Sequence, residues 1–343
     1  MAPPLALSVL DQTPVPQGTS PAEALGQTLA LARAAERLGY RRYWLAEHHD
    51  TPSLAGTAPE VLVAAVAAAT SSIRVGAGGV LLPYYSPLKV AETFRVLEAL
   101  HPGRIDLGIG RAAGTDARAE AALLASGGAS GDRRFAEHVA ELLAFLGLLD
   151  ADELGGDHEW AGVQAMPIGP GAPDVWLLGS SSYSSACAAS FGLSYAFAHF
   201  ITPAFGPRLV AGYRGRFRRG VREAPRCVVA VAAVCADSDA EAQRLASSAD
   251  LWRLGPEGSE RPPILPPEQV AARPWTELER MRVAQSRANV LVGDAERVAT
   301  RLRALADEFG VDELVVVTVC HDFDARCRSY ELLAEAFELA PGG

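Results

Sequence analysis

The stretch IRVGAGGVLLPYYSPLKVAETFRVLEALHPGRIDLGIG, residues 73–110, contains one complete strand–helix–strand unit. Residues 73–82 and 104–110 are short and mostly apolar, which predicts parallel strands covered on both faces. Between them, residues 87–100 are rich in Ala, Leu and Glu, which favour a helix. A helical crossover of this kind returns the chain so that the second strand lies parallel to the first.

The same alternation runs along the rest of the chain. Further strands are expected at 5–10, 42–47, 174–178, 194–200, 227–235 and 313–319. Further helices are expected at 20–38, 57–70, 132–146, 182–191, 204–218, 238–250, 294–309 and 325–338. Eight such units favour a (β/α)8 TIM barrel over a doubly wound sheet, and no G-x-G-x-x-G loop follows the first strand. We therefore expect an α/β protein with a single barrel domain over residues 1–343.

Three stretches do not fit the alternation and are interpreted as insertions. Residues 111–131 and 150–172 follow the fourth expected strand, and residues 251–285 follow the seventh. The last contains GPEGSERPPILPP, whose prolines and glycines predict a loop. Insertions in barrels often build or cover the active site, so we expect 251–285 to act as a lid.

Composition and charge limit the classes of function. Of 343 residues, 49% are apolar and 21% charged, which suits a large folded core. The net charge of −10 argues against binding to nucleic acid or to an anionic membrane surface. Five cysteines without a C-x-x-C pair fit reduced thiols, and the N-terminus lacks the basic region of a signal peptide. The expected location is the cytoplasm.

Polar and glycine residues collect where the expected strands end, which is where barrel enzymes carry their chemistry. These stretches are Glu47-His48-His49-Asp50, Gly78-Gly79, Gly110-Arg111, Gly179-Ser180-Ser181-Ser182-Tyr183, His199 and Cys320-His321-Asp322.

The stretch Gly179 to Tyr183 leads directly into a helix. The unpaired N–H groups and the dipole of a helix N-terminus attract an anion, so this stretch predicts a phosphate site. Arg111, after the preceding strand, can grip the same phosphate with two N–H groups. Alternatively, the serines only cap the helix, and Arg111 forms a structural ion pair.

The pair His48-His49 could indicate a metal site, but an acid–base group fits it better. Adjacent strand residues point to opposite faces, so both rings cannot easily bind one ion. The chain also has no H-x-H or H-E-x-x-H, and no metal is expected. His48 is either an acid–base group at the barrel mouth or a structural histidine. Gly78-Gly79 is either a bulge or a backbone surface on which a flat ligand lies.

Several stretches together resemble the bacterial-luciferase-like flavin monooxygenase family. They are YWLAEHH (43–49), IRVGAGGVLLPYYSPLKVAE (73–92), LHPGRIDLGIGRAAGTD (100–116), WLLGSSSYSSACAASFGLSYAFAHF (176–200) and VLVGDAERVATRL (290–302). The resemblance covers nearly the whole chain except the three insertions. Within the family, the chain is most similar to a branch of single-subunit enzymes that includes oxygenases of antibiotic pathways.

The resemblance implies an activity, a cofactor and partners. Reduced FMN and O2 would oxygenate a small organic substrate through a carbon-4a peroxyflavin, in the tailoring of secondary metabolites such as polyketides. A separate flavin reductase would supply the reduced FMN. The family commonly forms dimers through the helices after strands two and three, so a homodimer is expected.

The resemblance also implies roles for individual residues. His48 takes the place of the catalytic histidine. Gly78-Gly79 matches a non-proline cis peptide that lies against the isoalloxazine ring. The expected contacts to the FMN phosphate are Arg111, Gly179, Ser180 and Tyr183. His199 falls where an aromatic residue contacts the flavin ring, and Gly110 replaces a cysteine that lies near the flavin in luciferase.

Three other functions remain open at this point. A deazaflavin-dependent hydride-transfer enzyme would use the same barrel and also carries histidines at strand ends. A non-catalytic flavin-binding subunit would lack the residues corresponding to His48 and Arg111, both of which are present here. A metal-dependent barrel hydrolase is the most distant alternative.

Overall fold

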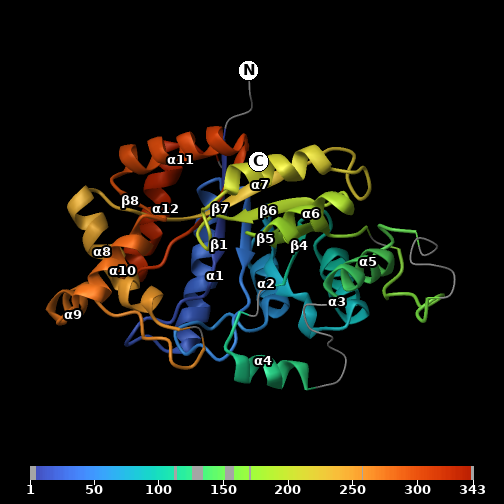
Figure 1. The fold of residues 1–343 in the computed structure, drawn as a ribbon, viewed down its shortest axis with the longest axis horizontal. Helices are drawn as coiled ribbons and strands as arrows, with labels where there is room; N and C mark the ends of the chain where they lie inside the picture. The colour runs from blue at the N-terminus through green and yellow to red at the C-terminus, as the bar shows by residue number, and fades with distance from the viewer. Residues whose placement is uncertain are drawn as a thin grey trace.

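A closed parallel barrel forms the centre of the protein (Figure 1). The computed structural model describes residues 5–111, 114–125, 134–150, 158–169, 171–256 and 258–340. The strands of the barrel are β1 (Ala6–Asp11), β2 (Arg42–Leu45), β3 (Arg74–Leu81), β4 (Ile105–Gly110), β5 (Asp174–Gly179), β6 (Ser194–Ala198), β7 (Cys227–Cys235) and β9 (Glu313–Val317). Because β9 pairs in parallel with both β1 and β7, the barrel closes. The predicted (β/α)8 TIM barrel is confirmed.

Helices surround these strands on the outside (Figure 1). They are α1 (Pro21–Arg37), α2 (Pro59–Ala69), α3 (Pro87–Leu100), α5 (Phe135–Phe145), α6 (Ser182–Ser190), α7 (Gly206–Arg216), α11 (Ala295–Phe309) and α12 (Phe323–Ala336). Alternate strand residues face opposite sides, so each strand has an outer and an inner set. On β2, Tyr43 and Leu45 pack in the core shared with the helices, whereas Trp44 belongs to the core inside the barrel.

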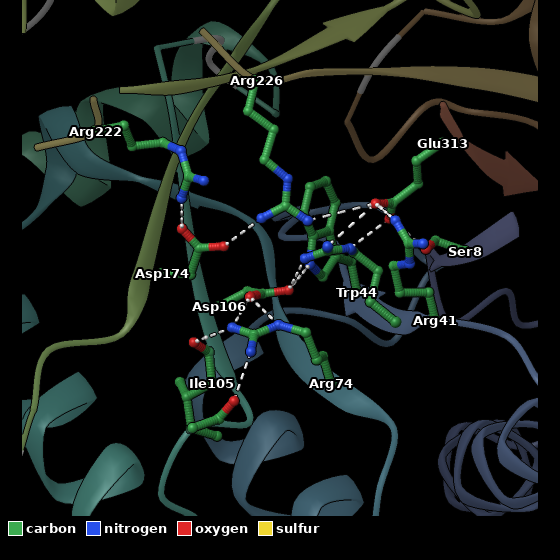
Figure 2. Close-up of polar contacts among 12 residues, drawn as sticks. Ser8, Arg41, Trp44, Arg74, Ile105, Asp106, Asp174, Arg222, Arg226 and Glu313 are labelled. Atoms are coloured by element: carbon green, nitrogen blue, oxygen red, sulfur yellow. Dashed lines mark hydrogen bonds and ion pairs between the residues drawn. The ribbon is translucent and has the colours of Figure 1, made fainter. Parts of the chain in front are cut away.

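The amino-terminal end of the barrel interior is filled by paired charges (Figure 2). Arg42, fully buried, donates to Asp106 Oδ2 at 2.7 Å and through Nη2 to Glu313 Oε2 at 3.2 Å. Asp106 also accepts hydrogen bonds from Arg74 and from Trp44 Nε1, the latter at 2.8 Å. Burial alone lowers the pKa of Arg42, but Asp106 and Glu313 outweigh it and raise that pKa above its usual range.

Two tryptophans form the next layer of the interior. Trp44 and Trp176 meet edge to face with their ring centroids 5.3 Å apart. The guanidinium of Arg42 lies 4.9 Å from the centroid of Trp176, so the charged layer is covered by aromatic faces. Among the described residues, these two layers fill the barrel interior at its amino-terminal end.

The predicted loop at 251–285 is wrong, because much of this stretch is helical. It contains the end of α8 (Asp239–Leu254), all of α9 (Pro267–Ala272) and most of α10 (Glu277–Arg287). Helix α10 begins with a capping box between Thr276 and Glu279, but none of its residues is buried. Its few large apolar residues, Leu278, Met281 and Val283, lie among charged residues, so the pattern gave no clear apolar period.

A ninth strand, β8 (Val290–Gly293), was also missed by the prediction of eight strands. It pairs with Ala232–Cys235 of β7, outside the closed barrel. Its four residues are too few to show a period, and they immediately precede α11. Within the first insertion, the short helix α4 (Ala117–Leu124) lies below the strands in Figure 1. The described residues do not include 112–113, 126–133, 151–157, 170 and 257, which belong to the predicted insertions or to the start of the predicted helix 132–146.

Among the helices that the structure describes, none is both long and apolar enough to cross a membrane.

The charged layer predicts a stability effect. Replacing Arg42 with methionine leaves Asp106 and Glu313 buried with fewer partners, which typically costs about 3–5 kcal/mol. We expect Arg42→Met to lower the unfolding free energy by that amount in urea denaturation. The control is Arg219→Met, since Arg219 is 83% exposed in its pair with Glu223 and should not change stability measurably. Equal stability of the two variants would contradict the structural role of the charged layer.

Candidate active site

A cavity of about 410 Å³ opens at the carboxyl-terminal ends of the strands. This volume lies within the range of about 300–1,000 Å³ that is usual for cofactor and ligand sites. Seven of the predicted site residues line this cavity: His48, Gly78, Gly79, Gly110, Arg111, Gly179 and Ser180. The wall also includes Leu10, Gln12, Trp44, Glu47, Glu120, Leu178, Ser181, Ser184, Phe200 and Ile201.

The bond between Gly78 and Gly79 is a non-proline cis peptide, as the resemblance implied. A Cβ on Gly78 would lie 2.9 Å from the Cβ of Trp44, and one on Gly79 would lie 2.8 Å from the carbonyl oxygen of Gly108. Both positions therefore require glycine. A Cβ on Gly110 would instead meet no atom within 4 Å, so this part of the wall is open. The result is a stretch of bare backbone along one side of the cavity.

The N-terminus of α6 forms another part of the wall. Ser181 caps the helix in a reciprocal capping box with Ser184, as the capping interpretation proposed. The backbone approaches so closely that a Cβ on Gly179 would lie 2.6 Å from Ser184 Oγ. Gly179 and Ser180 thus bring main-chain groups to the cavity beside the positive end of the helix dipole.

Arg111 lies at the same side of the cavity. Its guanidinium carbon is 4.6 Å from the ring centroid of Tyr183, in the first turn of α6. This cation–π contact places the arginine beside the N-terminus of the helix. Tyr183 itself is not part of the cavity wall; it contacts Arg111 and, at 6.4 Å between centroids, Phe135. The arginine and the helix dipole together make this region electropositive.

His48 presents a neutral imidazole at the cavity. Burial, with smaller contributions from Arg261 and His49, lowers the pKa of His48 to about 4. Its Nδ1 atom is buried and has no hydrogen-bond partner among the residues described. Its backbone N–H donates to Gly56 at 2.8 Å, which fixes the chain at this point. At neutral pH this ring can accept a proton from a bound molecule.

The neighbouring histidine has a different environment. His49 Nε2 is 2.7 Å from Glu47 Oε1, so the ring of His49 is held by a carboxylate. The described parts of the chain contain no group of three or more His, Cys, Asp and Glu side chains that is placed to hold a metal ion.

His199, the predicted contact to the flavin ring, is not among the residues that line the cavity. Its ring packs edge to face against Phe309 of α11, with 6.0 Å between centroids. Burial lowers the pKa of His199, and Glu308 opposes this shift. Phe197 packs in the outer core, whereas Ala198 and Phe200 line the cavity. Because β6 ends at Ala198, the strand period does not decide where the ring of His199 points, and its contact with the flavin ring stays a prediction.

The third insertion lies across the loops that follow three strands. Trp252 Nε1 donates to Ser53 after β2, and Gln17 N–H after β1 donates to Ile264. The N–H of Ser259 donates to the carboxylate of Asp116, which also caps α4 in the first insertion. Two of the predicted insertions thus meet at the carboxyl-terminal end of the barrel, next to the cavity.

Glu47 is the main site residue that the sequence reasoning did not select. It is buried and lines the cavity, although a continuous strand over 42–47 would have placed it on the outer face with Leu45. Strand β2 ends at Leu45, and the alternation is lost from there. The sequence signal that could have identified Glu47 was a carboxylate directly before a histidine at the end of a strand.

Comparisons with known proteins agree with this barrel and this cavity. The sequence profile of the luciferase-like monooxygenase family matches residues 5–313. The chain therefore belongs to this family of flavin-dependent monooxygenases, and it is an enzyme.

The similarity to individual relatives covers nearly the whole chain. A luciferase-like monooxygenase of Escherichia coli strain K12 is 39% identical, with 97% of each chain covered. The N-acetyl-S-alkylcysteine monooxygenase of Bacillus subtilis strain 168 is 33% identical, with 97% of this chain and 98% of the relative covered. The crystal structure of apo-MsnO8 superimposes with a TM-score of 0.86 at 41% identity, covering 98% of this chain and all of the other.

More distant structures share the fold alone. One is the oxygenating constituent of 3,6-diketocamphane monooxygenase of Pseudomonas putida in complex with FMN, at 20% identity over 99% of this chain and 98% of the other, with a TM-score of 0.68. Another is an F420-dependent secondary alcohol dehydrogenase, at 14% identity over 98% of this chain and 99% of the other, with a TM-score of 0.63. The same barrel therefore occurs with flavins and with the deazaflavin F420.

The low pKa of His48 predicts how stability depends on pH. An unfolded histidine titrates near 6.5 and His48 near 4, so the unfolded state binds more protons between these values. Stability should therefore fall as the pH decreases from 6.5 to 4, by about 3 kcal/mol from this group. We expect His48→Gln to lose less stability than the wild type over this range in urea denaturation. Parallel profiles of stability against pH for the two proteins would contradict a lowered pKa of His48.

Proposed function

We propose that this chain is an FMN-dependent monooxygenase that uses reduced FMN and O2 to oxygenate a small organic molecule in the cavity. The observation that carries the proposal is the meeting of Arg111 with the N-terminus of α6 at one side of a cavity whose wall also contains the cis Gly78-Gly79 backbone. The first feature suits a phosphate group, and the second leaves room for a flat ring.

The residues present fit FMN by two tests. Glycine is required at 78 and 79 because a Cβ would collide there with Trp44 or Gly108, so the backbone itself forms the surface for the ring. At the other side, the main chain of Gly179 and Ser180 and the guanidinium of Arg111 would hold the phosphate. Tyr183 would act indirectly, by supporting the guanidinium. The open space at Gly110 would admit the edge of the flavin.

The cofactor and the chain divide the chemistry. Bound reduced FMN supplies the two electrons with which one atom of O2 is reduced to water while the other enters the substrate. His48, neutral at pH 7, takes up or returns a proton beside the reacting atoms. The cavity must also exclude water, because water at the site would favour release of hydrogen peroxide over transfer of an oxygen atom to the substrate. The third insertion, tied to Asp116 and Ser53, serves as the cover.

The organic substrate is proposed to be small and largely apolar. Leu10, Trp44, Leu178, Phe200 and Ile201 supply apolar surface to the cavity. The tailoring of secondary metabolites remains the proposed setting, as the resemblance to antibiotic-pathway oxygenases suggests. The B. subtilis relative, named for N-acetyl-S-alkylcysteine, makes thioethers a second set of compounds to screen.

The proposed partners are a separate flavin reductase and a second copy of the chain, and the proposed location is the cytoplasm. Support for the homodimer comes from exposed apolar side chains on the two helices that the resemblance points to. Val61 of α2 is 63% exposed, and Leu100 of α3 is 65% exposed. A single barrel domain over 1–343 remains the proposed domain organisation.

Arg111 gives the test of the phosphate site. FMN and riboflavin share the ring system but differ in the phosphate, so Arg111→Ala should weaken FMN binding while leaving riboflavin binding unchanged. Loss of hydrogen bonds from a charged donor predicts a decrease of about tenfold to a hundredfold for FMN. Fluorescence titration of each flavin measures both affinities.

The matched control is Arg118→Ala, because Arg118 is exposed on α4 and does not line the cavity. Equal losses for FMN and riboflavin in Arg111→Ala would refute the phosphate contact. Binding of the deazaflavin F420 by the wild type, without binding of FMN, would favour the deazaflavin alternative.

A further inference from the structure

Glu47 joins two parts of the cavity wall that are distant in the sequence. Its carboxylate is buried, and the residue is 4% exposed. Oε2 accepts a hydrogen bond from the backbone N–H of Leu81 at 2.9 Å. Oε1 accepts one from the hydroxyl of Tyr85 at 2.6 Å and lies 2.7 Å from Nε2 of His49. One side chain thus holds the end of β3, the segment after η1 (Leu82–Tyr84) and the loop after β2.

These contacts lie next to the two features that the proposed function depends on. Leu81 follows the cis Gly78-Gly79 bond on the same strand, and His48 lies between Glu47 and His49. The first insertion meets the same point, because His49 N–H donates to Gly114 at 3.2 Å. A Cβ on Gly114 would lie 2.8 Å from Leu81 Cδ1, so the packing is close.

We propose that Glu47 is a positioning residue of the flavin site, which fixes the imidazole of His48 relative to the backbone at Gly78-Gly79. This proposal rests on the proposed function for its consequences in FMN binding. The length of the Glu47 side chain matters, because its carboxylate must contact groups from three segments at once. Glu47 is distinct from His48, which carries the proton chemistry.

Reach and charge can be separated by two substitutions. Glutamine keeps the length of the side chain: its oxygen can accept from Leu81 N–H, and its amide can donate to Tyr85 and His49. This is possible because a hydroxyl and a neutral imidazole can each switch between donating and accepting. Aspartate keeps the charge but is shorter by one carbon–carbon bond of about 1.5 Å, so it cannot reach all three partners.

The experiment compares the wild type, Glu47→Gln and Glu47→Asp by FMN titration and by visible circular dichroism of bound FMN. We expect Glu47→Gln to bind FMN within about threefold of the wild type with the same spectrum. We expect Glu47→Asp to bind at least about tenfold more weakly with an altered spectrum, while its melting temperature shows that it is folded. The control is Glu98→Gln, a buried glutamate that accepts from Gly103 N–H away from the cavity and should leave FMN binding unchanged.

Any other order of affinities overturns the proposal. Normal binding by Glu47→Asp with weak binding by Glu47→Gln would mean that charge, not reach, matters. Hydrogen exchange at the Leu81 amide gives a readout that needs no cofactor: protection should persist in Glu47→Gln and fall about tenfold in Glu47→Asp. Failure of the wild type to bind FMN would refute the proposed function. Equal protection of the Leu81 amide in all variants would instead refute the role of Glu47. If Glu47→Asp does not fold, Glu47→Gln decides the proposal: weak FMN binding or loss of Leu81 protection in folded Glu47→Gln, which keeps the length of the side chain, would overturn it.

Discussion

The ion pairs of Arg42 with Asp106 and Glu313 are the constraint on which the rest of the barrel depends. Charges inside a protein are tolerated only when each is paired and hydrogen-bonded, so these side chains fix the strands that carry them. They come from β2, β4 and β9, and Arg74 and Arg226 join them from β3 and the start of β7 (Figure 2). The described residues thereby fill the interior at one end of the barrel, and the cavity of the candidate site opens at the other.

The strands held by the charged layer also carry the candidate site. Strand β2 runs from Arg42 through Trp44 to Leu45, and Glu47 and His48 follow directly after it. Strand β4 runs through Asp106 to Gly110, and Arg111 follows. The ion pairs therefore fix the strands that lead to His48 and Arg111, and Glu47 is proposed to hold His48 from the side. A site built on strands in this way is more rigid than one built on loops, which suits a reaction that must exclude water.

The sequence predicts the barrel well because eight apolar strands alternate with amphipathic helices, and both patterns have a clear period. It also locates most of the cavity, since the site residues directly follow strands. The errors have physical reasons. Helix α10 carries few apolar residues and buries none of them, and β8 is only four residues long. Glu47 was missed because β2 ends at Leu45, after which the position of a side chain no longer follows from the strand period.

The proposed function requires a cavity that binds reduced FMN and shields its reaction with O2. Stopped-flow mixing of the protein and reduced FMN with oxygenated buffer tests this claim most directly. We expect the absorbance of oxidised FMN to appear more slowly than it does for free reduced FMN, because the bound flavin is kept from water. Reoxidation at the rate of free reduced FMN, under conditions in which oxidised FMN also fails to bind, would contradict it.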